Sequence, residues 1–535
     1  MVSRSKVVMV PTALHLVRAC HQFGGVTADL SSACVSCTVY KHSRGRPAAR
    51  GGEMGGTDSS TERRDAVARG LMPIVPIVDD PTRWTIDERR ERYGCPGVGV
   101  AVMRDGAIDW VDGFGHRTAN ATDGTPDGAI NGDTVFMVAS CSKPVSATLV
   151  LQQVAAGAVD LDTDVNRYLR RWQVPTNEFT ADSPVTLRRI LSHTAGLTVN
   201  GFGVTPRDGT PVPDEFDLLE GRPPSTMPPV VVDKAYDGTD RYSGGGFLIA
   251  QLLLEDVLGI PFDVLAERTL FGPAGMTRAT FHHPLAARYL DAIGGDIASG
   301  HGDDGRPFPG GWAISSEKAA GGLCCSARDY ANFLLAIHHA YHGRPGAILP
   351  KSLIDEMTTT QGSGAFGLGF RVIHDAGQLR LNHGGSNDGY QTESNLFPES
   401  GDGAVVFTNA TSGLFLFREV FNSIADTYQW RDFGPAPKRV ATLTEAQRQQ
   451  YIGSYRIVAG IELPLLRVWS DGGRLWNEIP GLRFGVQEVF VDDHGVLFSQ
   501  TGPFETHTVL GADGRCAELI VFEGSAPVLK AVRAE

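Results

Sequence analysis

The alternation of apolar and polar positions divides the chain into a mixed helical and extended stretch followed by a purely extended one. Residues 97–115 are predicted to form two strands joined at Asp105-Gly106, a dipeptide typical of hairpin turns. Apolar residues recur at spacings of three and four in 144–157, 186–193, 246–259, 328–343 and 414–430, which indicates helices. Strand-type runs return at 390–410. Strands at both ends of a helical insertion predict an α+β fold, with an antiparallel sheet flanked by helices and an all-helical subdomain.

Past residues 435–439 the helical spacing stops, and short strand-type runs alternate with turn signals. The turns fall at Asp471-Gly472, His494-Gly495, Asp513-Gly514 and Glu523-Gly524. This spacing predicts a small all-β barrel or sandwich of about 100 residues. We expect an N-terminal extension over 1–60, an α+β domain over 65–434 and a β domain over 436–535.

The first 60 residues differ from the rest, with one apolar patch followed by a Gly-, Ser- and Arg-rich run. A signal peptide, a disordered extension and translated sequence ahead of a start near Met54 are the three interpretations. Pro11 breaks the apolar run and Arg18 follows it without a convincing cleavage site, which makes the secretory interpretation the weakest. We expect a disordered extension and a cytoplasmic protein, or a periplasmic or secreted one if this segment is a signal.

Bulk composition argues against several classes of function. The 535 residues carry 48 Lys and Arg against 61 Asp and Glu, and a formal charge of -13 repels a nucleic-acid backbone. No apolar stretch is long enough to cross a bilayer. The 8 cysteines lack the spacing of a disulfide framework or a zinc site, and Cys34-x-x-Cys37 has no second ligand pair. We therefore expect mostly free thiols, no metal and no cofactor.

The run Ser140-Cys141-Ser142-Lys143 lies between an apolar stretch and the helix predicted at 144–157. Residues three apart share a helix face, so the Lys143 amine can reach the Ser140 hydroxyl. A buried lysine loses part of its preference for the charged form and can act as a base near neutral pH. Unpaired N–H groups at the helix start can stabilise an oxyanion. The spacing predicts Ser140 as a nucleophile that Lys143 activates.

The Ser-x-x-Lys spacing alone is a weak signal, because Ser3 to Lys6 and Ser315 to Lys318 match it too. Ser3 lies in the extension, and the Ala-Ala-Gly-Gly run after Lys318 continues a helix poorly. For any one match the alternative is a serine that only caps a helix beside a solvated lysine. Only Ser140 has both an apolar approach and a helix behind it.

From about Gly97 to Ala410 the chain resembles the serine β-lactamase and penicillin-binding-protein superfamily, in particular class C β-lactamases and family VIII carboxylesterases. The resemblance rests on SCSK at 140–143, LSHTAGL at 191–197, RYSGGG at 241–246 and HGG at 383–385. A further match, SEKAAGGL at 316–323, is interpreted as a structural scaffold segment without a catalytic role. The resemblance implies a β-lactamase-like fold and an acyl-enzyme mechanism.

Tyr242-Ser243-Gly244 falls where the family has Tyr-x-Asn. The resemblance implies that Tyr242 lies beside the nucleophile and relays protons, with the positive charge of Lys143 favouring its phenolate. A buried packing tyrosine is the alternative. Gly244 belongs to the implied substrate-binding set, but it lacks the asparagine amide that holds the side chain of a β-lactam.

His383-Gly384-Gly385 takes the place of Lys-Thr-Gly on the strand that lines the cleft. The resemblance implies that His383 orients the leaving group or a substrate carboxylate; a satisfied loop histidine is the alternative. Gly385 lets a substrate lie close to the strand, and the Ser386 N–H is the implied second oxyanion donor beside that of Ser140. Histidine in place of lysine removes a fixed positive charge that grips a lactam carboxylate.

The C-terminal β domain opens with YIGSYRIV at 451–458, which resembles the start of lipocalin-like domains. This resemblance implies either a structural or oligomerisation module or a ligand-binding calyx. We favour the first, with a homo-oligomer formed through this domain.

These observations predict a serine hydrolase that cleaves a carboxylic ester through an acyl-enzyme on Ser140, with Tyr242 as the base for the water that releases the acid. The alternatives are a β-lactamase or D-amino-acid peptidase with the same residues, and a catalytically silent ligand-binding relative. The expected partner is a small ester, amide or lactam. An α/β-hydrolase is excluded because the chain contains no G-x-S-x-G elbow.

Overall fold

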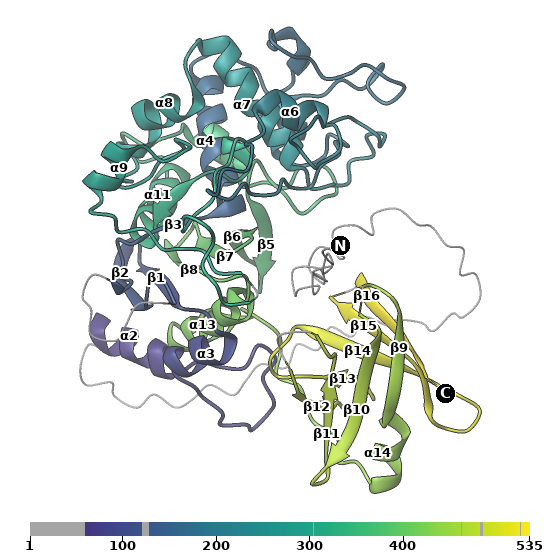
Figure 1. Ribbon diagram of the computed structural model, residues 1–535. Helices are drawn as coiled ribbons and strands as arrows, with labels where there is room; N and C mark the ends of the chain where they lie inside the picture. The colour runs from purple at the N-terminus through teal and green to yellow at the C-terminus, as the bar shows by residue number, and fades with distance from the viewer. Residues whose placement is uncertain are drawn as a thin grey trace, which may run out of the picture.

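The computed structural model describes residues 59–119, 128–302, 304–461, 463–481, 485–524 and 526–534. The predicted N-terminal extension lies almost entirely outside the described residues, and so do Ser3, Lys6, Cys34 and Cys37. The described chain forms an antiparallel sheet with helices on both faces, a helical region beyond it and a closed barrel (Figure 1). The predicted α+β fold with a C-terminal barrel is confirmed.

The sheet has the strand order β2-β1-β8-β7-β6-β5, and every neighbouring pair is antiparallel. Its strands are β1 (Gly97–Arg104), β2 (Ala107–Gly115), β5 (Arg371–Asp375), β6 (Gln378–Asn387), β7 (Tyr390–Phe397) and β8 (Asp402–Thr408). The predicted hairpin turn joins β1 to β2, with Asp105 and Gly106 both at positive φ. Since β1 also pairs with β8, strands from the two ends of this fold meet inside the sheet.

Alternate residues of the central strands enter two different hydrophobic cores. Val98 and Val100 pack with Val406 in the core beneath α2, α3 and α13. Ala101 and Phe407 face the opposite core, which contains α4 and α11. These helices are α2 (Ser60–Arg69), α3 (Ile86–Tyr93), α13 (Gly413–Thr427), α4 (Ser142–Ala155) and α11 (Ala327–Tyr341). Because successive side chains point to opposite faces of a strand, both faces of the sheet are covered.

The helical region lies beyond the sheet, at the top of Figure 1, and is organised around the buried helix α7. Its other elements are α5 (Leu187–Leu191), α6 (Glu215–Glu220), α8 (Phe262–Ala266), a π-helical turn (Glu267–Phe271), α9 (Ala287–Ala292), α10 (Lys318–Gly321) and α12 (Lys351–Met357). The helix α7 (Gly244–Leu258) begins after Ser243, whose Oγ accepts from the Gly246 N–H, and ends at Gly259 with φ 68°. The strands β3 (Val135–Met137) and β4 (Cys324–Ser326) form a separate two-stranded antiparallel sheet.

Four short helices that apolar spacing did not predict, among them α6, begin with capping boxes. Ser59 pairs with Glu62 at the start of α2, and Thr85 pairs with Glu88 at the start of α3. The same arrangement begins α14 (Glu445–Tyr451). In each, the cap side chain and the residue three positions later bond to one another's backbone N–H, which satisfies donors that a helix start leaves free.

The C-terminal strands close into an eight-stranded barrel of order β10-β11-β12-β13-β14-β15-β16-β9. They are β9 (Gly453–Ala459), β10 (Leu465–Asp471), β11 (Arg474–Glu478), β12 (Gln487–Val491), β13 (Leu497–Phe498), β14 (Phe504–Leu510), β15 (Cys516–Glu523) and β16 (Ala526–Arg533). The barrel has its own hydrophobic core, formed by side chains such as Tyr455, Val468 and Leu519. The oligomer expected through this barrel stays a prediction.

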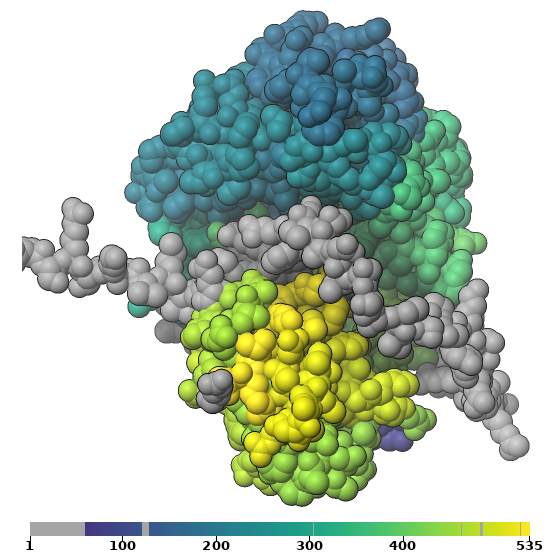
Figure 2. Space-filling view, turned by 90° about the vertical axis from the view of Figure 1, so that its right-hand side faces the viewer, coloured from purple at the N-terminus to yellow at the C-terminus, as the bar shows by residue number. Residues whose placement is uncertain are grey.

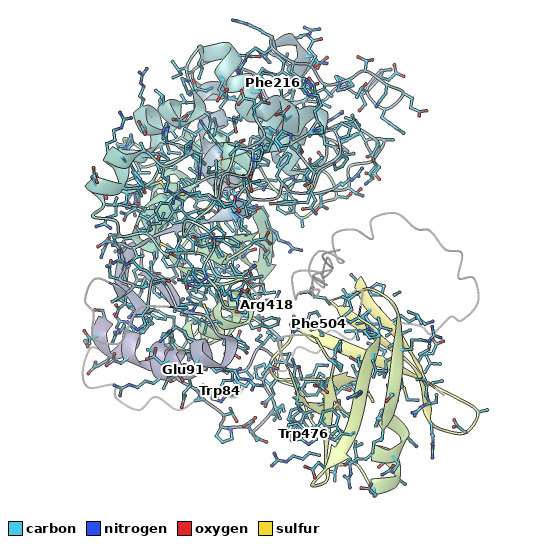
Figure 3. All side chains as sticks on the ribbon, in the orientation of Figure 1. Trp84, Glu91, Phe216, Arg418, Trp476 and Phe504 are labelled. Atoms are coloured by element: carbon cyan, nitrogen blue, oxygen red, sulfur yellow. The ribbon has the colours of Figure 1, made fainter. Side chains whose placement is uncertain are left out.

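The barrel packs against the α+β part through apolar and ionic contacts. Phe498 and Phe504 join the hydrophobic core beneath α13. Figure 3 shows Phe504 and Arg418 side by side at this junction, and Arg418 forms an ion pair with Glu523 at 3.2 Å. Lys438 pairs with Asp492 at 2.9 Å on the barrel side. In Figure 2 the barrel, in yellow and light green, stands below the blue and teal helical region.

The described residues bear on two expectations from composition. None of their helices combines the length and the apolar character that crossing a bilayer demands. The cysteines among them, Cys95, Cys141, Cys324, Cys325 and Cys516, are buried free thiols.

Candidate active site

Ser140 lies in a tight 3-10 turn (Ala139–Cys141) that leads directly into α4. Ala139, immediately before it, has φ 49°, a conformation that residues with a side chain rarely adopt. The turn is fixed on both sides, because the Val138 N–H donates to Leu323 O and the Cys141 N–H donates to Val138 O. Ser140 itself stays half-buried, so its hydroxyl is presented at the start of a helix.

The predicted contact between Lys143 and Ser140 is present. Lys143 Nζ donates to Ser140 Oγ at 2.9 Å and to the Ala320 carbonyl at 2.7 Å. The side chain is 2% exposed, and burial lowers the pKa of the amine to about 7. At neutral pH a large fraction of Lys143 is therefore uncharged and able to take a proton from Ser140.

The second Ser-x-x-Lys match has no such contact. Lys318 Nζ forms an ion pair with Asp263 at 2.8 Å, while Lys143 is the lysine that reaches a serine. Local spacing is the same at both places, so the tertiary surroundings decide which lysine meets its serine.

Tyr242 lies beside both residues, but its acidity differs from what the sequence predicted. The Ser140 side chain interacts with its hydroxyl and lowers its pKa, and Lys143 Nζ lies over its ring, 4.8 Å from the centroid. Burial raises the pKa of the phenol well above its usual value of about 10. The expectation that Lys143 favours a phenolate is wrong, because the amine lies over the ring and burial has the largest effect on the pKa of the phenol.

The backbone at Gly244 lies in close contact with a neighbouring loop. A Cβ at this position would lie 3.0 Å from the Asn200 carbonyl, and the Gly244 N–H donates to that same oxygen at 2.9 Å. A side chain at residue 244 would therefore need the neighbouring loop to shift by a few tenths of an ångström. Gly244 itself offers no amide group in place of the family asparagine.

The strand β6 places Gly385 against the nucleophile. A Cβ on Gly385 would lie 2.2 Å from the Val138 carbonyl and 3.1 Å from the Ser140 nitrogen, so only glycine fits. Thr392 on β7 donates to the same Val138 carbonyl at 2.9 Å. Ser386 follows on the exposed face of β6, with its Oγ accepting from Gln391 Nε2 at 2.9 Å. Its N–H as the second oxyanion donor stays a prediction.

His383 is buried at 4% exposure in the wall formed by Tyr242 and Phe366. Its Nδ1 lies 2.7 Å from the Gly384 carbonyl, and its buried Nε2 has no hydrogen-bond partner. Burial, together with the charge of Lys143, lowers the pKa of the ring to about 3. His383 is therefore neutral at neutral pH and offers no positive charge to a substrate carboxylate.

His193, from the stretch LSHTAGL, is a member of the site to which sequence reasoning gave no role. Its ring lies 4.2 Å from that of Tyr242, and its Nδ1 accepts from the Ser243 N–H at 3.1 Å. The residue has φ 61°, and its buried Nε2 has no partner. Burial holds the pKa of this ring well below its ordinary value. His193 thus packs against Tyr242 as a neutral ring and holds the residue that caps α7.

The segment that sequence analysis interpreted as scaffold takes part in the site. The Ala320 carbonyl on α10 accepts from Lys143, and the buried carboxylate of Glu317 raises the pKa of that amine through its charge. Burial in turn raises the pKa of Glu317 to about 7. A glutamate before an Ala-Ala-Gly-Gly run carries no local signal for this role, because it follows from tertiary packing alone.

Replacing Glu317 by glutamine tests its influence on Lys143. With Lys143 in its predicted role as the neutral base, kcat/KM should rise with pH through a pKa of about 7. Removing the Glu317 charge removes an influence that raises this pKa, so the rising limb should move to lower pH. Glu399→Gln, an exposed carboxylate far along the chain, is the control. A limb that stays in place or moves to higher pH in Glu317→Gln contradicts the assignment.

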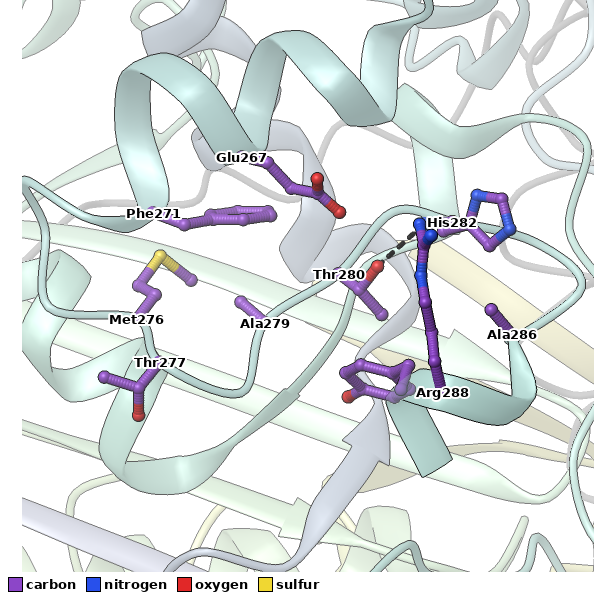
Figure 4. Close-up of a pocket in the computed structure, with 10 residues that line it drawn as sticks. Glu267, Phe271, Met276, Thr277, Ala279, Thr280, His282, Ala286 and Arg288 are labelled. Carbon is purple, nitrogen blue, oxygen red and sulfur yellow. Dashed lines mark hydrogen bonds between the residues drawn. The ribbon is translucent and has the colours of Figure 1, made fainter. Parts of the chain in front are cut away.

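A separate surface cavity of about 260 Å³ lies beside the π-helical turn, and Figure 4 shows the residues that line it. Phe271, Met276 and Tyr289 form apolar walls, with Glu267 and Arg288 exposed at its edge. It shares no lining residue with the cluster around Ser140. The cavity is therefore distinct from the candidate active site.

Comparisons with known proteins agree with this geometry. A family model described as Beta-lactamase matches residues 83–429. Penicillin-binding protein 4 of Amycolatopsis lactamdurans is 27% identical over 386 residues, covering 66% of this chain and 93% of that protein. Esterase EstB of Burkholderia gladioli is 30% identical over 126 residues, 22% of this chain and 32% of that protein. The crystal structure of SurE with D-Leu covers 89% of this chain and 100% of its own, with a TM-score of 0.51 and 21% identity.

The region matched by the family model contains the whole cluster built around Ser140, from the 3-10 turn to β6. The similarity to SurE extends the agreement in fold beyond that region. The chain therefore belongs to the beta-lactamase family, within the superfamily of serine β-lactamase-like and penicillin-binding-protein-like hydrolases.

Proposed function

We propose that this serine hydrolase cleaves carboxylic esters through an acyl-enzyme on Ser140. The observation that carries the proposal is the contact between Ser140 Oγ and the buried amine of Lys143, whose pKa is lowered to about 7. A hydroxyl whose proton can pass to a neutral amine becomes a nucleophile at neutral pH.

In the first half-reaction, Ser140 Oγ bonds to the acyl carbon while its proton passes to Lys143. The Ser140 and Ser386 N–H groups hold the oxyanion. The carbon–oxygen bond to the leaving group then breaks, and the proton passes from Lys143 through the Tyr242 hydroxyl, which interacts with the Ser140 side chain, to the departing alkoxide. Tyr242 acts as a neutral relay, since its raised pKa disfavours a free phenolate.

In the second half-reaction, water attacks the acyl carbon and the bond to Ser140 Oγ breaks. We assign the base for this water to Lys143 rather than to Tyr242, because the raised pKa of Tyr242 disfavours that role, and Lys143 returns the proton to Ser140. The free acid leaves and the resting state is restored. No metal or cofactor takes part in this scheme.

Two features favour an ester over a lactam or a peptide with a terminal carboxylate. His383 is neutral where a fixed cation would bind the carboxylate, and Gly244 has no amide side chain to hold that of a lactam. The similarity to esterase EstB supports the same choice, although it covers only part of each chain. A β-lactamase or D-amino-acid peptidase is the second candidate, supported by the longer similarity to penicillin-binding protein 4.

Side-by-side assays of p-nitrophenyl butyrate and nitrocefin distinguish these candidates from each other and from a silent binding protein. We expect turnover of the ester, little reaction with nitrocefin and loss of both in Ser140→Ala. Faster turnover of nitrocefin than of the ester would promote the lactamase. Binding without turnover of either substrate would favour the silent relative.

A further inference from the structure

His383 and Gly385 share one face of β6, because residues two apart on a strand point the same way. Gly385 abuts the Ser140 nitrogen on that face, so the His383 side chain lies one step along the strand from the nucleophile. The strand is held in this place, since the His383 carbonyl accepts from Cys141 Sγ at 3.3 Å and from Ser394 Oγ at 3.2 Å. His383 is therefore a fixed part of the wall beside the reacting bond.

The hydrogen bond at Nδ1 decides which ring nitrogen of His383 carries the proton. A carbonyl oxygen only accepts, so Nδ1, at 2.7 Å from the Gly384 carbonyl, is the donor. Burial and the nearby charge of Lys143 both lower the pKa of the ring and keep it neutral. In a neutral imidazole with a protonated Nδ1, Nε2 presents a lone pair.

This lone pair is buried and unpaired in the structure. The rings of Tyr242 and Phe366 lie beside His383, at centroid distances of 6.2 and 6.3 Å, and are 5.9 Å from each other. A buried acceptor without a donor is unfavourable, and a ligand that supplies the donor removes the penalty. A carboxylate at the same place supplies only hydrogen-bond acceptors, so it leaves Nε2 without a donor.

The proposed reaction determines which part of the substrate meets His383. Tyr242 returns the proton to the departing alcohol, so the leaving group lies beside Tyr242 and hence beside His383. We propose that His383 Nε2 accepts a hydrogen bond from an uncharged hydroxyl or N–H donor on the leaving group, and that the site disfavours a carboxylate there. This inference rests on the proposed ester hydrolysis.

Three phenyl acetates of matched shape test the preference: 3-hydroxyphenyl acetate, 3-methylphenyl acetate and 3-acetoxybenzoate. They differ at one position of the leaving phenol, which bears a donor, an apolar group or a carboxylate. In the wild type we expect kcat/KM to be highest for the hydroxyl ester, about tenfold above the carboxylate ester. Equal values for the hydroxyl and methyl esters, or a preference for the carboxylate, overturn the inference.

Two variants separate the charge at residue 383 from general electrostatics. His383→Lys replaces the lone pair by a cation and should reverse the preference in favour of the carboxylate ester. His374→Lys adds the same charge on the exposed face of the neighbouring strand β5 and should leave the order of the esters unchanged. The same reversal in both variants contradicts the role of His383.

Failure of the inference is distinguishable from failure of the proposed function. If the wild type hydrolyses the three esters in a Ser140-dependent way without a preference for the hydroxyl, only the role of His383 is overturned. If Ser140→Ala leaves hydrolysis of the three esters unchanged, or if the wild type cleaves none of them, both the proposed function and this inference are contradicted.

Discussion

Lys143→Met should lower kcat/KM for p-nitrophenyl butyrate on the order of 10³-fold, the range typical of a lost general base. Methionine matches the length of the lysine stem and suits the buried site, so the protein should remain folded. The loss comes from the amine, which donates to Ser140 Oγ and is the group with a pKa near neutrality. Tyr242 cannot replace it, because burial raises the pKa of its phenol.

Lys318→Met is the matched control, since Lys318 follows the other described serine at the same spacing and pairs with Asp263. We expect it to change kcat/KM by less than about tenfold. Steady-state rates and a circular dichroism spectrum of each variant separate lost chemistry from lost fold. Equal losses in the two variants would mean that the contact between Lys143 and Ser140 is not what activates the serine.

Glu419→Ala should destabilise the α+β part by about 3–5 kcal/mol, the cost of leaving a buried charge without its partner. Glu419 on α13 is fully buried, and its carboxylate accepts from Arg89 Nε at 2.7 Å and Nη2 at 2.6 Å, and from the Tyr93 hydroxyl at 2.7 Å. These bonds join α3 to α13 beneath the sheet. Without Glu419, the Arg89 guanidinium stays buried without a charged partner and keeps only its hydrogen bond to the Tyr93 hydroxyl.

Urea unfolding followed by tryptophan fluorescence measures this loss, because Arg89 stacks on Trp84 at 3.9 Å. Glu399→Ala removes an exposed carboxylate and should shift the midpoint little. The double variant Arg89→Met with Glu419→Leu should recover much of the lost stability, because it removes both charges at once. A single variant as stable as the wild type contradicts the structural role of this ion pair.

The long elements were predictable from sequence because their apolar spacing is strong. Helices α7, α11 and α13 and the hairpin of β1 and β2 all appear where the pattern placed them. The short helices α2 and α3 were missed, since their apolar residues are few and their stability comes from packing against α13. The capping boxes that begin at Ser59 and Thr85 are the sequence signals from which these helices could have been predicted.

Within the site, the proximity of Ser140 to Lys143 followed from helical spacing, and the structure brings Tyr242 and His383 to the same place. The direction in which the pKa of Tyr242 shifts could not be predicted, because the sequence does not show that the amine lies over the ring. Glu317 was missed for a related reason. Its influence depends on burial beside an amine that is 174 residues earlier in the chain, and such contacts leave no local pattern.

The most direct measurement is the intact mass of the protein after brief reaction with p-nitrophenyl pivalate, whose bulky acyl group slows the release of an acyl-enzyme. We predict the mass of a single pivaloyl group on the wild type, located by peptide mapping on Ser140, and none on Ser140→Ala. Acyl mass that persists in Ser140→Ala, or that maps to another residue such as Ser315, would contradict the assignment of the nucleophile.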